Sequence, residues 1–161
     1  MEMIQKLLNT EEVSYTSHLN EKSLKQRIEG LFEQKTARLA GKLTSDNEFS
    51  AHDNLVVIGW NMPYLRRKAA YLKGEIAEGE HGTTIQLKVT PNAILPVFGV
   101  VAVISGVIIS LLTMFNNTSN NFFLLLGVAF LALGIIYYPL STLFRNRLRN
   151  KFVKYLGLRK S

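Results

Sequence analysis

Charged residues are distributed very unevenly along the chain, and their absence defines its most regular pattern. From Val89 to Phe144 there is no Asp, Glu, Lys, Arg or His. Two apolar runs of 23 residues each, Ala93 to Phe115 and Phe122 to Phe144, flank the polar residues 116–121. A helix of that length spans roughly 34 Å, enough for a hydrocarbon core of about 30 Å. The pattern predicts two transmembrane helices, 93–115 and 122–144, joined by a short external loop. The alternative is a buried helical hairpin in a soluble fold.

The first 92 residues show shorter periods. Val13 to Leu19 alternate as in a strand, and Asn20 can cap a helix that has an apolar stripe at Leu24, Ile28, Leu31 and Phe32. Four strand-like pieces follow: 37–43, which leads through a turn cluster to Phe49 and Ala51, and then 55–58, 69–77 and 83–89. The last is the clearest, because alternate apolar positions place Thr83, Ile85, Leu87 and Val89 on one face. The order β-α-β-β-β-β predicts a cytoplasmic α+β domain, residues 1–92, built as an antiparallel sheet with one helix on one face.

The segment after the second apolar run, residues 145–161, predicts a basic amphipathic helix. Its apolar side chains cluster on one side at 100° per residue: Phe144, Leu148, Phe152, Tyr155 and Leu156. Two interpretations have equal weight. The helix lies in the bilayer interface, or its apolar side covers the sheet of the first domain.

Small residues recur along both apolar runs and predict a site of close helix packing. They are Gly99, Ala102, Gly106 and Ser110 in the first run and Gly127, Gly134 and Ser141 in the second. Because a loop of six residues makes the two helices neighbours, we expect these faces to pack on each other as an antiparallel hairpin. The alternative is that one face packs on another copy of the chain.

The formal charge of +7 belongs entirely to the end of the chain. All 12 acidic residues precede Val89, together with 12 of the 19 basic residues, and mean hydropathy (+0.10) averages over these unlike parts. The remaining basic residues are Arg145, Arg147, Arg149, Lys151, Lys154, Arg159 and Lys160. A pI near 9.7 suggests nucleic acid, but positive charge directly after a membrane span is typical of contact with anionic lipid headgroups. We expect the first five of these residues to make that contact, and we expect no nucleic-acid partner.

The same charges predict the topology. The loop at 116–121 has no basic residue, whereas the tail has seven. The positive-inside rule therefore places both termini in the cytoplasm. A second region that could touch the bilayer surface is the aromatic segment Trp60 to Tyr64 with the basic residues 66–68 after it; burial of Trp60 in the core is the alternative.

No pattern in the sequence indicates catalysis, a metal or a cofactor. There is no cysteine, and His18, His52 and His81 have no metal-ligand spacing. The apolar runs contain no ionisable group of the kind that proton relays and coupled transporters use. Ser105, although followed by Gly106, has no histidine in the apolar runs to act as its base. We therefore expect neither an enzyme nor a cofactor.

One stretch carries a resemblance. Tyr71-Leu72-Lys73-Gly74-Glu75-Ile76-Ala77-Glu78, then Gly82-Thr83-Thr84-Ile85, followed by two apolar spans and a basic helix, resembles a loose group of small bacterial membrane proteins. They have an α+β domain before a two-helix hairpin. The resemblance covers roughly residues 71–161 and implies this fold and a place in the bacterial cytoplasmic membrane. It implies no activity and no site residues.

These observations favour a non-catalytic, membrane-anchored interaction or assembly module. Its expected partners are the anionic bilayer and another membrane or cytoplasmic protein, and a homo-oligomer is possible. The alternative is a small homo-oligomeric pore or channel, which Ser105, Ser110 and Thr113 could line.

Overall fold

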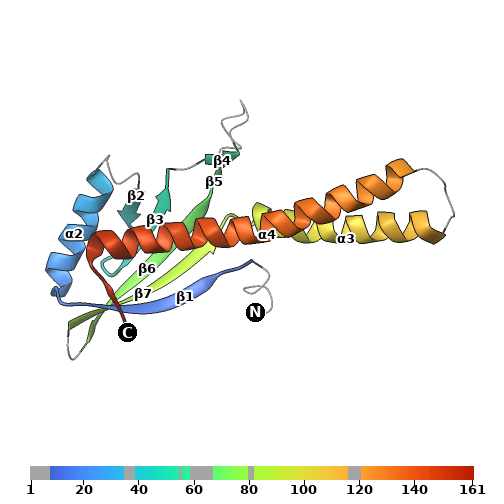
Figure 1. Ribbon diagram of the computed structural model, residues 1–161. Coiled ribbons are helices and arrows are strands. Elements are labelled where there is room, and N and C mark those ends of the chain that lie inside the picture. Colours follow the sequence, from blue (N-terminus) through green and yellow to red (C-terminus); the bar gives the residue numbers. More distant parts are fainter. Residues whose placement is uncertain (1–7, 35–38, 55, 59–66, 80–81, 116–120) are drawn as a thin grey trace.

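A sheet domain and a helical hairpin are joined end to end in the computed structural model (Figure 1). The structure describes residues 8–34, 39–54, 56–58, 67–79, 82–115 and 121–161. The aromatic segment at 60–64 and the loop at 116–120 lie outside the described residues.

The sheet has six antiparallel strands in the order β2-β3-β6-β7-β1-β8. Their bounds are β1 Glu11–Ser17, β2 Leu39–Leu43, β3 Glu48–Asp53, β6 Ala70–Gly79, β7 Gly82–Pro91 and β8 Arg159–Lys160. Two further strands, β4 (Val56–Ile58) and β5 (Arg67–Lys68), pair separately. The α+β class with an antiparallel sheet is confirmed. The strand predicted at 55–58 is present as β4, but it pairs with β5 apart from the main sheet, and β5 and β8 were not predicted.

One face of this sheet is covered by two helices. Alternate residues of β7, including Ile85, Leu87 and Val89, are buried beneath them, so the predicted alternation is confirmed. α2 (Glu21–Glu33) is capped by Asn20, whose side chain accepts a hydrogen bond from the Ser23 backbone N–H at 2.9 Å. α2 packs on β2 and β6.

The hairpin consists of α3 (Ile94–Phe115) and α4 (Asn121–Leu156). Both helices are long and apolar enough to cross a membrane. The sequence pattern divides the second helix from a tail after Phe144, but α4 continues without a break to Leu156. No Gly or Pro lies between residues 140 and 156 to end the helix, and α4 also passes through Pro139.

The continuous helix carries the chain from the hairpin onto the sheet, where α4 packs on β6 and β7. Leu148, Phe152 and Leu156 are buried there, so of the two interpretations of the tail the structure shows the one in which its apolar side covers the sheet. Tyr155, which was expected on the same side, is 41% exposed.

A stacked aromatic pair holds α4 on the sheet. The rings of Phe49 and Phe152 are stacked with their centroids 5.2 Å apart. The Phe49 ring lies against the backbone of Gly74, where an added Cβ would come within 2.0 Å of it. Gly74 thus makes room for the ring that α4 rests on.

α4 ends in a Schellman motif that returns the chain to the sheet. Gly157 has φ +66°, and the Leu158 backbone N–H donates to the Val153 carbonyl at 3.1 Å. The following residues form β8, which adds to the free edge of β1. The residues after α4 are therefore fixed to β1, the first strand of the sheet in chain order.

Candidate functional site: the foot of the hairpin and the open face of the sheet

Most small residues of the two apolar runs lie where α3 meets α4, whereas Ser141 lies against Asn9. Gly99, Ala102 and Gly106 on α3 and Gly127, Gly134 and Ser141 on α4 are all buried. A Cβ added at Gly106 would lie 2.8 Å from the Gly127 carbonyl oxygen, and one added at Gly134 would lie 2.7 Å from that of Gly99. The backbones approach so closely that only glycine fits at these positions.

Two hydroxyls of α3, those of Ser110 and Thr113, contact the backbone of the hairpin. The Ser110 Oγ lies against Gly127, where an added Cβ would be 2.5 Å from it. The Thr113 hydroxyl donates to the Ile109 carbonyl at 2.7 Å. Two of the three residues proposed to line a pore therefore face their own protein backbone, and the pore itself stays a prediction.

At the foot of the hairpin, α4 is bonded to the chain just before β1. The Asn9 side-chain amide donates to the hydroxyl oxygens of Ser141, at 3.1 Å, and Thr142. Arg145 donates to both the backbone and the side-chain oxygen of Asn9. Ser141 is fully buried and also donates to the Tyr138 carbonyl at 2.7 Å. These bonds fix the position at which α4 leaves the hairpin.

Four of the five residues expected to contact anionic lipid form ion pairs with acids of the sheet domain. Glu11 pairs with Arg145, at 3.1 Å, and with Arg149. Asp53, whose side chain is only 6% exposed, lies 3.7 Å from Arg147 and 3.5 Å from Lys151. Lys154 is exposed, two turns beyond Arg147. Lipid contact by this set stays a prediction, but the four basic side chains are already held on the protein.

Glu11 and Asp53 were not identified as partners from the sequence. A usable signal existed, because Arg145 and Arg149 are four residues apart, as are Arg147 and Lys151. Residues at this spacing share a helix face, so each pair can meet one acidic group. The sequence did not show which acids the fold would bring there.

The second candidate region is the face of the sheet that neither helix covers, which we call the open face. Its polar side chains form rows across the strands, because paired residues lie directly opposite one another. From the hairpin end outward, the first row is His52, Tyr71 and Thr90; the lysine row is Lys42, Ser50, Lys73, Lys88 and Glu12; the glutamate row is Glu48, Glu75, Gln86 and Ser14.

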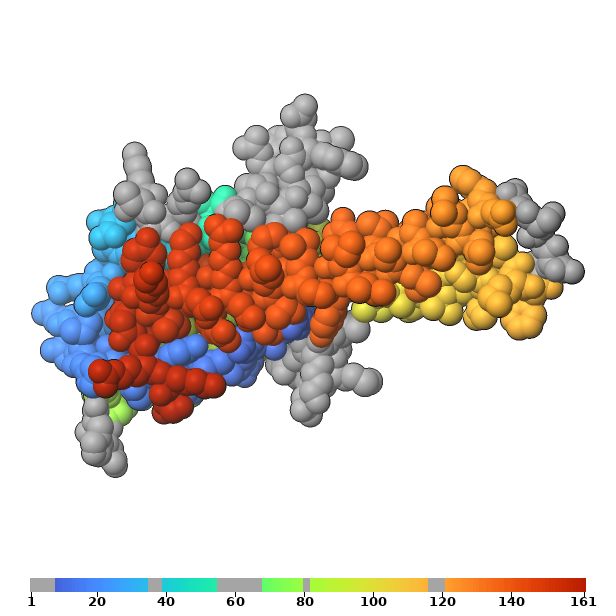
Figure 2. Space-filling view, viewed as in Figure 1, coloured from blue at the N-terminus to red at the C-terminus, as the bar shows by residue number. Residues whose placement is uncertain are grey.

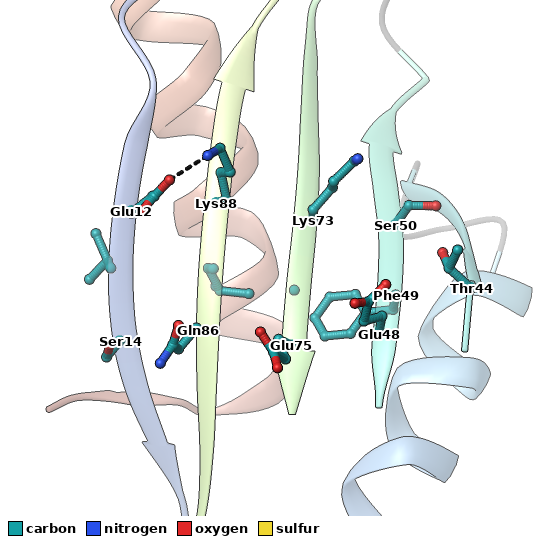
Figure 3. A pocket seen from close by; sticks show the side chains of 13 residues that line it. Glu12, Ser14, Thr44, Glu48, Phe49, Ser50, Lys73, Glu75, Gln86 and Lys88 are labelled. Atoms are coloured by element: carbon teal, nitrogen blue, oxygen red, sulfur yellow. Dashed lines mark hydrogen bonds and ion pairs between the residues drawn. The ribbon is translucent and has the colours of Figure 1, made fainter. Parts of the chain in front are cut away.

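The lysine and glutamate rows border a shallow groove of about 500 Å³ (Figure 3). Lys88 pairs with Glu12, whereas Lys73, Glu48 and Glu75 have no ion-pair partner among the described residues. Like charges lie opposite each other twice, at Lys73–Lys88 and at Glu48–Glu75. Such pairs destabilise a sheet, so this arrangement has a cost that packing within the chain does not explain.

The histidines do not form a site with these groups. His18 is exposed after β1, and His81 lies outside the described residues. His52 lies in the first row of the open face, where partial burial and then the positive charge of Lys68 lower the pKa of its imidazole. Among the residues that the structure describes, no group of three or more His, Asp or Glu side chains could hold a metal ion.

Comparisons of the chain with protein-family models, with curated proteins and with solved structures found no match. The resemblance to small bacterial membrane proteins therefore stays an expectation, and function has to be argued from the fold and its surfaces.

Proposed function

We propose that this protein is a non-catalytic interaction or assembly module that is anchored in a membrane by its helical hairpin. The anchor is supported by how little of the surface of the two helices the rest of the protein covers. Only 28% of the most apolar stretch of α3 and 11% of that of α4 is buried inside the protein. Large apolar side chains such as Val101, Ile108, Leu125 and Ile135 are about half or more exposed.

Water is a poor solvent for this surface. A monomeric soluble protein seldom exposes a continuous apolar patch of more than a few hundred Å². The hairpin projects beyond the sheet domain, and its side chains are uncovered along its length in this view (Figure 2). The 22 residues of α3 span roughly 33 Å, which matches a hydrocarbon core.

The observation that carries the interaction role is the contrast between the two faces of the sheet. α2 and α4 bury one face, whereas the open face has a groove and charges that form no ion pair among the residues that the structure describes. The Asn9 bonds and the Phe49–Phe152 stack fix the domain to α4, so the open face is held at a defined position relative to the hairpin. A rigid, polar, uncovered surface next to a membrane suits the binding of another membrane or cytoplasmic protein.

The charge distribution supports a cytoplasmic position for this domain. All seven basic residues after the second apolar run lie on the same side of the hairpin as the sheet. The positive-inside rule then places the sheet and both termini in the cytoplasm.

Photocrosslinking from the open face tests the proposal. A photoreactive amino acid is introduced at Gln86, in the middle of the open face, and in a control variant at Lys22, which is exposed on α2. In native membranes we expect Gln86, but not Lys22, to give a distinct protein adduct. No adduct from Gln86, or equal adducts from both positions, would contradict the proposal. A ladder of self-adducts from a third probe at Ile104, on the outer face of α3, would favour the pore.

A further inference from the structure

The charges on the open face are sorted by their distance from the hairpin. The first row contains no acidic side chain. The lysine row, next outward, has three lysines and one glutamate, and the glutamate row beyond it has two glutamates and no basic residue. Rows that are two residues apart are separated by roughly 7 Å. Within these rows positive charge therefore lies on the hairpin side of the negative charge, and Arg159 of β8, which lies opposite Thr16, is beyond the glutamate row.

A further cation lies closer still to the hairpin. The Lys68 backbone carbonyl accepts a hydrogen bond from the Asn92 side chain at 3.0 Å, and Asn92 in turn caps the start of α3. The side chain of Lys68 is near enough to His52 for its charge to lower the pKa of that imidazole. Lys68 thus belongs to the end of the domain at which the chain enters the apolar hairpin.

The two central lysines, Lys73 and Lys88, extend toward the hairpin end of the sheet. In Figure 3 the side chain of Lys73 points toward the end of the sheet from which β7 leads to α3, and Lys88 extends the same way before its ammonium turns to Glu12. Lys88 is four positions before Asn92, which is roughly 13 Å of extended chain. The headgroup layer on one side of a bilayer is about 5–8 Å thick. The lysine side chains extend into the remaining gap, so their charges come within a Debye length of about 8–10 Å of the headgroups.

This sorting also decides against a second copy as the occupant of the face. Two copies in one membrane are related by an axis along the membrane normal, and rotation about that axis leaves every residue at its own height. The lysine row of one copy would then meet the lysine row of the other, and the glutamate rows would meet as well. Both contacts are repulsive.

We propose that Lys68, Lys73 and Lys88 form a binding site for the phosphate groups of anionic lipids, an inference that rests on the proposed membrane anchoring. The lysines hold the hairpin end of the open face against the headgroups, while Glu48 and Glu75 are directed away from the negative surface. The glutamate side of the groove stays free for a protein. Lys88 is paired with Glu12, but both side chains are about half exposed and open to solvent. Four of the tail cations are instead held by the more buried acids Glu11 and Asp53.

Lysine reactivity in the full-length protein tests this site. The protein is placed in nanodiscs of phosphatidylcholine alone or of phosphatidylcholine with phosphatidylglycerol, and each lysine's rate of acetylation by a water-soluble reagent is measured by mass spectrometry. Lys22 on α2 is the internal control. Lys154 tests the tail, because nine helical residues place it roughly 13 Å beyond Arg145.

We expect phosphatidylglycerol to slow acetylation of Lys73 and Lys88 by about fivefold, the factor for one basic residue near an anionic surface. Lys22 and Lys154 should be unchanged, and 1 M salt should abolish the protection. Protection of Lys154 without Lys73 and Lys88, or equal rates in both lipids, would overturn the site. Acetylation of Lys73 and Lys88 that slows as more copies share one disc, to the same extent in both lipids, would also overturn the site, in favour of a second copy.

A paired variant gives an independent measurement. Lys73→Gln with Lys88→Gln should retain fewer phosphatidylglycerol molecules in native mass spectrometry, whereas the control Lys22→Gln should match the parent. Equal retention would contradict the inference. Failure of the protein to enter nanodiscs at all would instead contradict the membrane anchor, so the two failures are distinguishable.

Discussion

The two halves of α4 belong to one helix but are covered in opposite ways. In the first half large apolar side chains such as Leu125 and Ile135 are about 70% exposed. In the second half Leu148 and Phe152 are completely buried on the sheet. The first half is apolar on all sides, whereas the second is apolar only toward the sheet and carries basic residues elsewhere.

Under the proposed anchoring, this contrast lets one helix serve two surroundings. A helix in lipid needs apolar residues on its outer surface, and its packing depends on small residues that let backbones approach. A helix on a sheet in water needs a single apolar stripe and solvated flanks. Since α4 continues unbroken through Pro139 from one half to the other, it transmits the position of the hairpin directly to the sheet domain.

The largest effect is expected at the buried stripe of the second half. Phe152→Ala removes the ring that stacks on Phe49 and should lower the free energy of unfolding by about 3–5 kcal/mol. The control is Tyr155→Ala, three residues along the same helix and 41% exposed, which should cost less than about 1 kcal/mol. Denaturant titration in mild detergent measures both. Equal losses would show that α4 does not depend on this stripe for its place on the sheet.

In the first half, the helix contact is expected to be next most sensitive. Gly106→Leu cannot fit beside the Gly127 carbonyl, 2.8 Å from an added Cβ, and should cost on the order of 1–3 kcal/mol by forcing the helices apart. Ile104→Leu, on the exposed side of α3, is the matched control. A Gly106→Leu protein that melts with the parent in detergent would show that α3 and α4 do not pack through their small residues.

The ion pairs on the second half should contribute less. Asp53→Asn leaves Arg147 and Lys151 without their acid, and we expect a loss of about 1 kcal/mol, since Arg147 is half exposed and solvent screens the pair. A double-mutant cycle with Lys151→Gln measures the coupling. No coupling at low salt would mean that the paired charges do not hold α4 on the sheet.

The smallest effect is a dependence on pH. Burial and Lys68 lower the pKa of the His52 imidazole from its ordinary value of 6.5. The unfolded chain therefore binds a proton first, and stability should fall as the pH is lowered through about 6.5 and level off below the folded pKa. His52→Gln should reduce the difference in melting temperature between pH 7.5 and pH 5.5. An unchanged difference would show that His52 titrates alike in both states.

Local patterns predicted most of the fold, and long-range pairing supplied the rest. The alternation around Ile85 and the stripe at Leu24, Ile28 and Leu31 determine which faces are buried, and both were readable from spacing alone. Strand β8 was not, since two residues cannot show a period and its pairing depends on where α4 delivers the chain.

Most of the candidate site could not be predicted from the sequence, because it too depends on long-range pairing. That Lys73 lies opposite Lys88 follows from the register of β6 on β7, which a sequence pattern does not display. Asp53 is 94 residues before Arg147, so only the folded sheet brings them together.

The central claim, that the hairpin crosses a membrane and leaves the sheet domain in the cytoplasm, is tested most directly by thiol accessibility. The chain has no cysteine, so single Ser119→Cys and Ser161→Cys variants each report one site. In intact spheroplasts an impermeant thiol reagent should label Ser119→Cys, and it should label Ser161→Cys only after the membrane is permeabilised. The reverse pattern would overturn the orientation, and equal labelling of both before permeabilisation would contradict a hairpin that crosses the membrane.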